Sequence, residues 1–376
     1  MTRLRRRRTF GIFVAALIVN ANGLAAEEAP AAPPSLGAVT PAARRGFLAR
    51  AQLWRPIATE GLDLLAGPNG AGRFAFNATV NCEYVDDRGQ LDGMTPKFFC
   101  RTDEETLKIK YGDGNGEVYA EVVATRLFWA LGFGADAVYP VRITCRRCPM
   151  DPWNWRTSQR FAERRFEHAT VERKFDGVAI ESEGQGGWSW PELDLVDPAA
   201  GGAPLAHREA LKLLAVFVQH GDNKRAQQRL VCLRDGVRQT ASEVTCERPF
   251  LLVSDLGATF GGAGKLSRNK SAKLNFEKWS TKPVFKDGPG CTGDLAGAIT
   301  GDLSDPPIRE AGRRFLAERL AQLTDVQIRD LFTAGRVEER GEKRVDSGRR
   351  RPVTVDDWLR AFKDRRAQIA QRRCPE

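Results

Sequence analysis

The stretch HGDNKRAQ, residues 220–227, joins a predicted helix to a predicted strand. Phosphoryl transfer requires a carboxylate that orients the attacking hydroxyl and accepts its proton, and an oxygen ligand for the metal a few residues later. Asp222 and Gln227 have this separation, which matches the interval between Asp and Asn in kinase catalytic loops. Considered alone, the stretch fits a polar turn better than a catalytic loop, so the surrounding sequence decides the interpretation.

The stretch PFLLVSDLG, residues 249–257, predicts a buried strand that delivers Asp255 to a turn. Gly257 allows the backbone to bend at this point. A carboxylate that projects from a rigid strand end suits a Mg²⁺ ligand near phosphates. An Asp-x-Gly after a strand is common, so the informative feature is its position after the candidate catalytic loop, with a predicted hairpin between them.

A lysine-bearing strand followed by an acidic helix lies upstream. The strand LKIKY, residues 107–111, is followed by a helical pattern that contains Glu117 and Glu121. A strand lysine can bind α- and β-phosphates when a helix carboxylate holds it in place. The two glutamates share a helix face because they are four residues apart. Lys108 and Lys110 share a strand face, which leaves the choice between them open, and solvent-exposed roles compete for Lys108 and Glu117.

The order of these features indicates the fold class. A strand lysine, a helix glutamate, a strand, a long helix, a loop with Asp222, a hairpin and an Asp-x-Gly occur in the sequence that a kinase fold requires. We therefore expect an α+β, two-lobed protein-kinase-like fold, with a small strand-rich N-lobe and a larger helical C-lobe. The expected divisions are a signal peptide at 1–26, a linker at 27–41, an N-lobe at 42–148, and a C-lobe with basic C-terminal helices at 149–376.

Hydrophobic periodicity predicts the individual elements. Strands are expected at 71–84, 97–101, 106–111, 135–144, 228–234 and 249–254. Helices are expected at about 41–53, 120–131 and 205–219, with Gly132 as a C-terminal cap, and further helices follow toward the C-terminus. Thr324–Gln327 has the form of a capping box and Gly335 supplies a stop. Residues 145–202 contain many Trp, Gly and Pro residues and give no clear pattern.

The chain resembles HipA-type kinases in three places. Lys110-Tyr111, the run from Glu121 to the Leu-Gly at 131–132, and the loop Gly93-Met94-Thr95-Pro96-Lys97 are similar to the phosphate-binding lysine, the helix and the loop over ATP phosphates of that family. His220-Gly221-Asp222 and Asp255-Leu256-Gly257 look like the catalytic loop and metal aspartate of a wider atypical group. That group includes phosphoinositide lipid kinases, spore-coat CotH kinases and secretory-pathway Golgi kinases. The resemblance covers roughly residues 93–262.

The resemblance implies ATP with Mg²⁺, or Mn²⁺, as cofactor. The implied site consists of Lys110 and Glu121 with Gly93 and Lys97 at the phosphates, Asp222 at the acceptor hydroxyl, and Asp255 and Gln227 at the metal. Gln227 stands where most relatives have Asn, and its extra methylene shifts the ligand oxygen. Lys224 follows the aspartate where several relatives have His or Arg, so it is either near the transferred phosphate or in a surface salt bridge.

Eight cysteines, an even number, favour disulfides in an exported protein. Connectivity does not follow from sequence alone, and the provisional local assignment pairs Cys82 with Cys100, Cys145 with Cys148, Cys232 with Cys246, and Cys291 with Cys374. The alternative for Cys145-x-x-Cys148 is half of a zinc site, but no second Cys-x-x-Cys or Cys/His pair lies nearby.

The N-terminus has the pattern of a secretory signal peptide: five arginines in the first eight residues, an apolar run at 10–19, and small residues ending at Ala25–Ala26. The apolar run is too short for a bilayer span of about 20 residues, and no second span is expected. Removing the five arginines lowers the formal charge from +10 to +5. The remaining basic stretches, 336–351 and 360–373, fit solvated helix faces better than a nucleic-acid site.

These patterns predict an exported phosphotransferase that acts on a protein, sugar or lipid hydroxyl. Because ATP is scarce outside a bacterial cytoplasm, a bacterial source would favour another nucleotide donor or nucleotidyl transfer. The alternatives are a pseudokinase that keeps the fold without turnover, and a disulfide-stapled extracellular binding protein without a nucleotide site. The sequence does not identify the acceptor or the oligomeric state.

Overall fold

The computed structural model describes residues 36–376 apart from positions 37, 71, 88–90, 92, 94, 155–159, 183–185, 240–243, 263–272, 296–299 and 347. The predicted signal peptide, and the predicted linker up to residue 35, lie outside the described residues. Helices and strands are both abundant in the part that is described, which confirms the α+β class.

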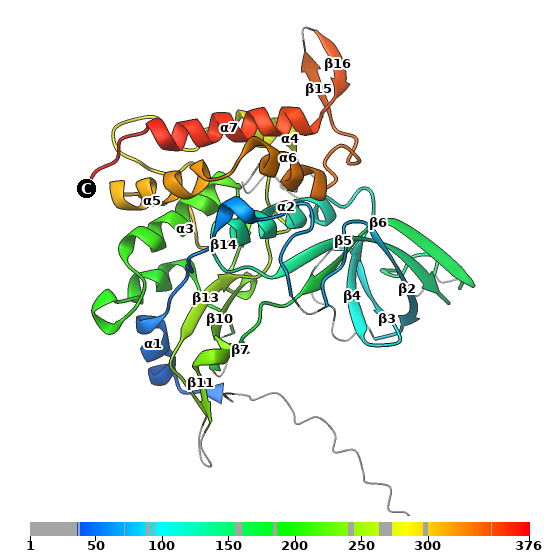
Figure 1. Ribbon diagram of the computed structural model, residues 1–376, viewed down its shortest axis with the longest axis horizontal. Helices are drawn as coiled ribbons and strands as arrows, with labels where there is room; N and C mark the ends of the chain where they lie inside the picture. Colours follow the sequence, from blue (N-terminus) through cyan, green and yellow to red (C-terminus); the bar gives the residue numbers. More distant parts are fainter. Residues whose placement is uncertain are drawn as a thin grey trace, which may run out of the picture. The chain divides into compact units, whose positions relative to one another are not determined.

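Five strands form a closed barrel (Figure 1). They are β2 (Ala78–Val85), β3 (Lys97–Arg101), β4 (Thr106–Tyr111), β5 (Ala137–Arg146) and β6 (Glu163–Arg173), in the order β2-β3-β4-β6-β5 with parallel β2–β5 pairing at the closure. Phe98, Tyr111 and Phe166 pack inside, with ring centroids 4.9–5.3 Å apart. The β3–β4 hairpin has the predicted bounds, whereas β6 comes from the stretch without a clear pattern and lies beyond the expected boundary at residue 148.

Helix α2 (Glu117–Ala130) follows β4 and is buried around nearly its whole circumference. Its length and apolar composition agree with the helix predicted there. Gly132 has a left-handed φ of +85°, and a Cβ at this position would stand 2.3 Å from the Arg55 carbonyl oxygen. The predicted glycine stop is therefore confirmed, and it is required by a close backbone approach as well as by φ.

A smaller sheet begins directly after residues 220–227 and contains residues 249–253 as one of its strands. Its strands are β7 (Val178–Ala179), β10 (Gln228–Cys232) and β13 (Pro249–Val253), in the order β13-β10-β7. The antiparallel register pairs Gln228 with Val253 and Cys232 with Pro249, which confirms the predicted hairpin. Helix α3 (Leu205–Phe217) precedes the loop that leads into this sheet, as predicted.

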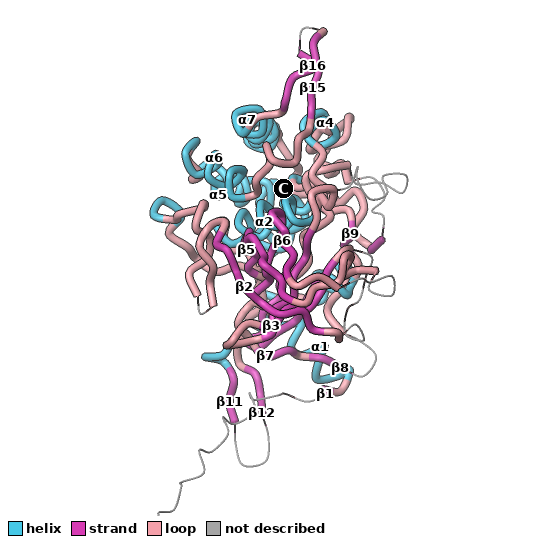
Figure 2. The backbone as a smooth tube through the Cα atoms, turned by 90° about the vertical axis from the view of Figure 1, so that its right-hand side faces the viewer, coloured by secondary structure: helices cyan, strands magenta, loops and turns pink. Residues whose placement is uncertain are grey.

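The remaining helices are α1 (Pro41–Arg50), α4 (Phe276–Thr281), α5 (Glu310–Ala321), α6 (Asp325–Ala334) and α7 (Val355–Gln371). The remaining strands are β1 (Ala38–Val39), β8 (Glu181–Ser182), β9 (Asp222–Asn223), β11 (Val237–Gln239), β12 (Val244–Cys246), β14 (Thr300–Gly301), β15 (Lys343–Asp346) and β16 (Arg349–Pro352). Helix α6 starts with the predicted capping box, in which Thr324 and Gln327 bond reciprocally. Both ribbon and tube views show the β15–β16 hairpin projecting beyond α7 (Figures 1 and 2).

Aromatic side chains form the core between α4, α6 and α7. Phe260, Trp279, Phe332 and Trp358 are fully buried, and the Trp279 and Trp358 rings stack with centroids 5.3 Å apart. Burying each such side chain contributes roughly 2–3 kcal/mol, so this cluster fixes the helices that follow residue 273. No helix in the described ranges combines the length and hydropathy that crossing a bilayer requires.

All eight cysteines form disulfides, and the four predicted pairs are confirmed: Cys82–Cys100, Cys145–Cys148, Cys232–Cys246 and Cys291–Cys374. The zinc alternative for Cys145 and Cys148 is wrong because both sulfurs are bonded to each other. Four disulfides are compatible with an exported protein.

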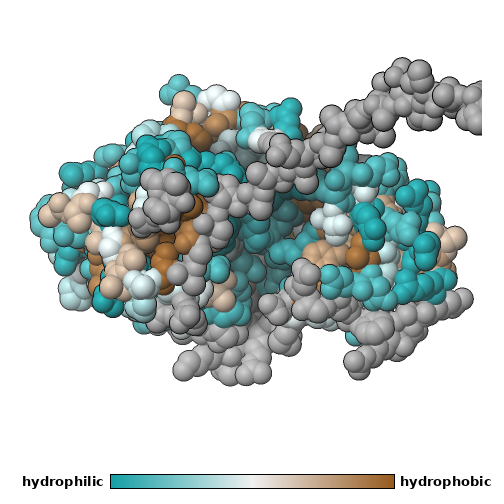
Figure 3. Space-filling view, turned by 90° about the horizontal axis from the view of Figure 1, so that it is seen from below, coloured by the Kyte–Doolittle hydropathy of each residue, from teal (hydrophilic) through white to brown (hydrophobic). Residues whose placement is uncertain are grey.

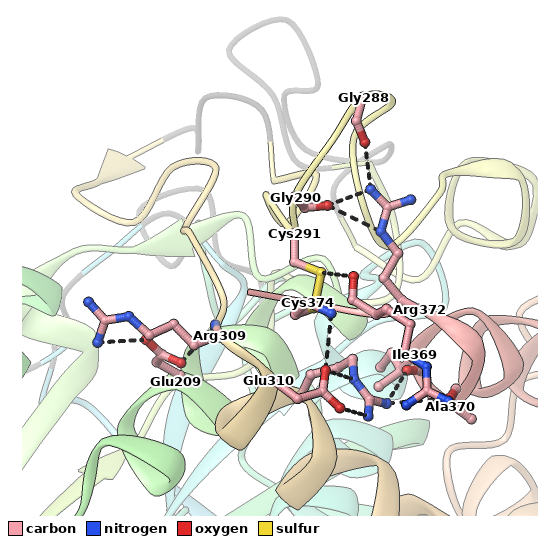
Figure 4. The surroundings of a disulfide bond; sticks show 12 residues. Glu209, Gly288, Gly290, Cys291, Arg309, Glu310, Ile369, Ala370, Arg372 and Cys374 are labelled. Carbon is pink, nitrogen blue, oxygen red and sulfur yellow. Dashed lines mark hydrogen bonds and ion pairs between the residues drawn. A yellow bond between two sulfur atoms is a disulfide. The ribbon is translucent and has the colours of Figure 1, made fainter. Parts of the chain in front are cut away.

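The Cys291–Cys374 bridge secures the end of the chain (Figure 4). The Cys374 N–H donates to Glu310 Oε2 at 3.0 Å, and Glu310 Oε1 pairs with Arg313 Nη2 at 2.5 Å. These contacts fasten the residues after α7 to the start of α5.

Candidate functional site

Lys110 and Glu121 form a buried ion pair between β4 and α2. The Lys110 ammonium lies 2.8 Å from each of the two carboxylate oxygens of Glu121. Lys110 is 4% exposed and Glu121 is fully buried. Two charges removed from water in this way are stable only when they are paired and hydrogen-bonded, and this geometry satisfies that condition.

Two more carboxylates approach the same ammonium from different elements. Glu117 Oε2, from the first turn of α2, lies 3.7 Å from Lys110 Nζ, and Asp255 Oδ2, from the loop after β13, lies 3.8 Å away. Burial alone would lower the pKa of Lys110, but the carboxylates of Asp255, Glu121 and Glu117 outweigh it and raise that pKa well above its usual value. The ammonium is therefore charged at any physiological pH.

The choice between the two strand lysines follows from the register of β4 and β6. That register pairs Ile109 with Val171 and brings Lys108 beside Glu172, with Nζ and Oε2 2.7 Å apart. Lys108 is thus bound to the neighbouring strand, while Lys110 faces α2. Glu172 was missed by the sequence reasoning, because the charged residues of β6 obscure its alternation.

Asp255 stands at the end of β13 in a turn held by backbone bonds. Its Oδ1 accepts from the Gly257 N–H at 3.0 Å, and its Oδ2 faces Lys110. Burial would raise the pKa of Asp255, but the Lys110 charge and the Gly257 N–H bring it below its usual value. The Asp255 side chain keeps 36% exposure, so one face of an ionised carboxylate remains open to a ligand.

Asp222 and Gln227 meet within the loop after α3. Gln227 Nε2 donates to Asp222 Oδ2 at 2.8 Å, and Lys224 Nζ lies 3.4 Å from the same oxygen. The Lys224 side chain is 47% exposed, which places it at the rim. The sequence interval between Asp222 and Gln227 therefore corresponds to a direct side-chain contact.

Backbone hydrogen bonds join this loop to the Asp255 turn. The Gln227 carbonyl accepts from the N–H groups of Ser254 and Asp255 at 2.8 and 3.2 Å, and the Gly221 N–H donates to the Ala258 carbonyl at 2.8 Å. Residues 220–227 and the turn after β13 are thus one hydrogen-bonded unit, and Asp255 connects this unit to Lys110.

His220, the first residue of the His-Gly-Asp stretch, was given no role of its own from sequence. It is fully buried, and the Ala258 backbone is the hydrogen-bonding group near its ring. Burial lowers the pKa of His220 to about 4, against the opposing influence of the Asp222 and Asp255 carboxylates. Both carboxylates therefore act electrostatically on one imidazole, which stays neutral at pH 7.

Gly93 and Lys97 belong to the segment before β4. Lys97 is directly opposite Lys110 in the β3–β4 register, and burial together with the Lys110 charge lowers the pKa of Lys97. Gly93 has φ +84°, and a Cβ there would stand 3.4 Å from Lys97 Nζ. Thr95, between them, donates from Oγ1 to Glu117 Oε1 at 2.6 Å.

The oxygen atoms available at the two loops suit Mg²⁺ in chemical type. The Asp255 and Asp222 carboxylates and the Gln227 side-chain carbonyl are hard ligands of the kind that Mg²⁺ binds, usually together with waters and substrate phosphates. No cluster of three or more His, Cys, Asp or Glu with metal-binding geometry occurs within the described ranges. Seen from below, the surface has a hydrophilic hollow between the barrel on the right and the rest of the described chain (Figure 3).

Comparisons with known proteins assign no family to this chain. No protein-family model matches the sequence, and no curated protein matches it at a significant level. Among solved structures, the crystal structure of a proinflammatory kinase, CtkA, from Helicobacter pylori aligns with 78% of this chain and 95% of its own, at 9% identity and a TM-score of 0.39.

Proposed function

We propose that this protein is an exported atypical kinase-like phosphotransferase that binds ATP with Mg²⁺ and acts on a hydroxyl group. The observation that carries the proposal is the convergence on Lys110 of a helix carboxylate, Glu121, and a turn carboxylate, Asp255, at 2.8 and 3.8 Å. A charged lysine held by one carboxylate and facing a second is the arrangement that phosphate binding next to a metal requires.

Each residue has a role that follows from its contacts. Lys110, fixed by Glu121, would bind phosphate oxygens, with Lys97 and the turn at Gly93 beside it. Asp255 and Gln227 would hold Mg²⁺, which supplies charge neutralisation at the phosphates when bound. Asp222 would orient the acceptor hydroxyl and accept its proton. In this proposal the barrel with α2 forms the smaller lobe and the helical remainder forms the larger lobe.

Lys224 has two open roles in this scheme. Its ammonium is 3.4 Å from Asp222 Oδ2 and half exposed, so it reaches either the transferred phosphate or only its own aspartate. The export part of the proposal rests on the four disulfides and on the signal-like N-terminal sequence.

The proposal is tested by thermal unfolding of the mature protein, from Ala26 or Glu27 onward with its disulfides intact. A ligand that binds only the folded state raises the unfolding temperature. We expect ATP to do so in the presence of Mg²⁺ or Mn²⁺ and to do so less with EDTA. The absence of a shift with every nucleotide and both metals would leave only a binding protein without a nucleotide site.

A pseudokinase is the second candidate, and the length of the Gln227 side chain favours it. Gln stands where most kinases of the resembling group have the shorter Asn, and its extra methylene shifts the position of a metal-binding oxygen. A thermal shift with ATP but no transfer of labelled phosphate, either to the protein itself or to a mixture of protein, sugar and lipid acceptors, would select the pseudokinase.

A further inference from the structure

A cavity of about 590 Å³ lies beside the Lys110 cluster and takes no part in the roles assigned above. This volume falls within the range of roughly 300–1,000 Å³ that is typical of small-molecule sites. Its walls come from the end of β4, the loop between β4 and α2, and the segment between β5 and β6. It is separate from Asp222 and Gln227, which do not line it.

The cavity adjoins the proposed phosphate site through one short link. Thr95 and Lys273 line the cavity, and both contact Glu117 Oε1, at 2.6 Å each. Glu117 in turn lies 3.7 Å from Lys110 Nζ. A molecule in the cavity is therefore separated from the phosphate-binding lysine by a single layer of side chains.

Three aromatic side chains line the cavity, and two of them, Tyr111 and Phe166, are largely buried. Tyr111, Trp153 and Phe166 all contribute, with the Tyr111 and Phe166 rings 4.9 Å apart. Aromatic faces bind the C–H surfaces of flat or ring-shaped ligands, and the partly exposed Trp153 is the most accessible of the three.

Polar groups surround these rings and are already held in position. The Tyr111 hydroxyl donates to Asp151 Oδ1 at 2.7 Å, and Asn154 Nδ2 donates to Asp151 Oδ2 at 2.7 Å. Asn115, on the opposite loop, is fixed by a bond from its Nδ2 to the Tyr111 carbonyl at 3.1 Å. Hydroxyl-bearing ligands can add hydrogen bonds to such carboxylate and amide groups without reorganising them.

We infer that this cavity binds a sugar ring, with the accessible Trp153 face against its C–H groups and Asp151, Asn154 and Asn115 at its hydroxyls. A sugar is favoured over an extended peptide because β3, β4, β5 and β6 are paired within the closed barrel and present no free strand edge to a peptide. Neither Asp222, which would orient the acceptor, nor Lys110 lines this cavity, so the sugar site is distinct from the acceptor position and sugar binding does not depend on the proposed function.

Two variants test the cavity without removing core residues. Gly114 lines it, and a Cβ there meets nothing within 4 Å, so Gly114→Trp fills the space. Trp153→Ala removes the accessible aromatic face. Gly70→Trp is the matched control, because Gly70 is also open to a Cβ and lies outside the cavity.

The measurement is saturation-transfer NMR, without nucleotide, on glucose, N-acetylglucosamine and glucuronate at millimolar concentration. We expect at least one sugar to bind, Trp153→Ala to weaken it about tenfold, and Gly114→Trp to abolish it while Gly70→Trp does not. The inference would be overturned if none of the three sugars bound, or if Gly114→Trp left sugar binding intact. It would also be overturned if a Ser/Thr peptide bound the cavity and the sugars did not. Sugar binding by a protein whose unfolding temperature does not respond to ATP would refute the proposed function and leave this inference standing.

Discussion

Gly257 packs directly against Glu117: a Cβ on Gly257 would stand 2.7 Å from Glu117 Cγ. The turn that presents Asp255 therefore depends on a glycine for contact with α2 as well as for its bend. The Glu117 carboxylate also forms an ion pair with Lys273 and accepts a hydrogen bond from Thr95. Glu117 therefore joins the Asp255 turn to two further segments of the chain.

Gly257→Ala is expected to displace Glu117 and move Asp255 away from Lys110. We predict loss of the ATP-dependent thermal shift together with destabilisation of roughly 1–3 kcal/mol. Gly46→Ala is the control, because Gly46 is in α1 with open space for a Cβ, and it should stabilise by about 0.4–1 kcal/mol. Urea unfolding and the thermal shift measure both effects, and an intact ATP shift in Gly257→Ala would contradict the assigned contact.

Lys110 and Lys108 should differ sharply in their contribution to stability. Lys110→Met leaves buried Glu121 without its partner and should cost roughly 3–5 kcal/mol. Lys108→Met should cost about 1 kcal/mol or less, because Lys108 is 31% exposed in its side chain and Glu172 keeps Lys174.

A double-mutant cycle separates the pair from other effects of Lys110. Adding Glu121→Gln to Lys110→Met should recover part of the lost free energy of unfolding. Equal costs for the two lysine variants, or strict additivity in the cycle, would show that Lys110 and Glu121 do not act as a pair.

The lowered pKa of His220 leads to a specific pH dependence of stability. Its folded pKa of about 4 lies below the ordinary value of 6.5, so the unfolded state binds more protons between these values. Stability contributed by neutral His220 is therefore present above pH 6.5 and is lost as pH falls toward 4, by about 3 kcal/mol in total.

The test compares wild type with His220→Phe in urea at several pH values. As pH falls from 6.5 to 4, the unfolding free energy of the wild type should decrease relative to that of the variant, which has no imidazole to protonate. A difference that is constant over this range would show that His220 is not buried in neutral form.

Much of the fold was predictable from local sequence. The β3–β4 hairpin, the β10–β13 pair, α3 and the α6 capping box follow from periodicity and end signals that act over a few residues. The barrel was not predictable, because its closure depends on parallel β2–β5 pairing and on β6, whose many charged residues hide the alternation. These are long-range pairings without a local signal.

The candidate site was likewise predictable from sequence only in part. Sequence order suggested Lys110, Glu121 and Asp255, and the fold places both carboxylates within 4 Å of the Lys110 ammonium. Lys273 and Glu172 carried no recognisable pattern, because their positions depend on distant segments. His220 belonged to the recognised His-Gly-Asp stretch, but its complete burial appears only in the folded protein. The bond between Gln227 and Asp222 likewise appears only once the loop is folded.

The four disulfides should contribute unequally to the free energy of unfolding. The chain-entropy model makes a bridge more stabilising when it closes a longer loop, so Cys291–Cys374, with a separation of 83, should contribute roughly 4–5 kcal/mol. Cys232–Cys246, with a separation of 14, should contribute about 3 kcal/mol. Urea unfolding of the two paired Cys→Ala variants measures this, and a larger loss at Cys232–Cys246 would contradict the expectation.

Calorimetric titration with ATP tests the central claim most directly, that Asp255 and Asp222 have different roles at one nucleotide site. We predict that wild type binds ATP in Mg²⁺, that Asp255→Asn abolishes the Mg²⁺-dependent part, and that Asp222→Asn binds normally while any phosphate transfer falls by ~10²-fold or more. Asp194→Asn, at an exposed ion pair outside the site, should match wild type. Unchanged Mg²⁺-dependent binding in Asp255→Asn, or no binding by wild type, would contradict the account.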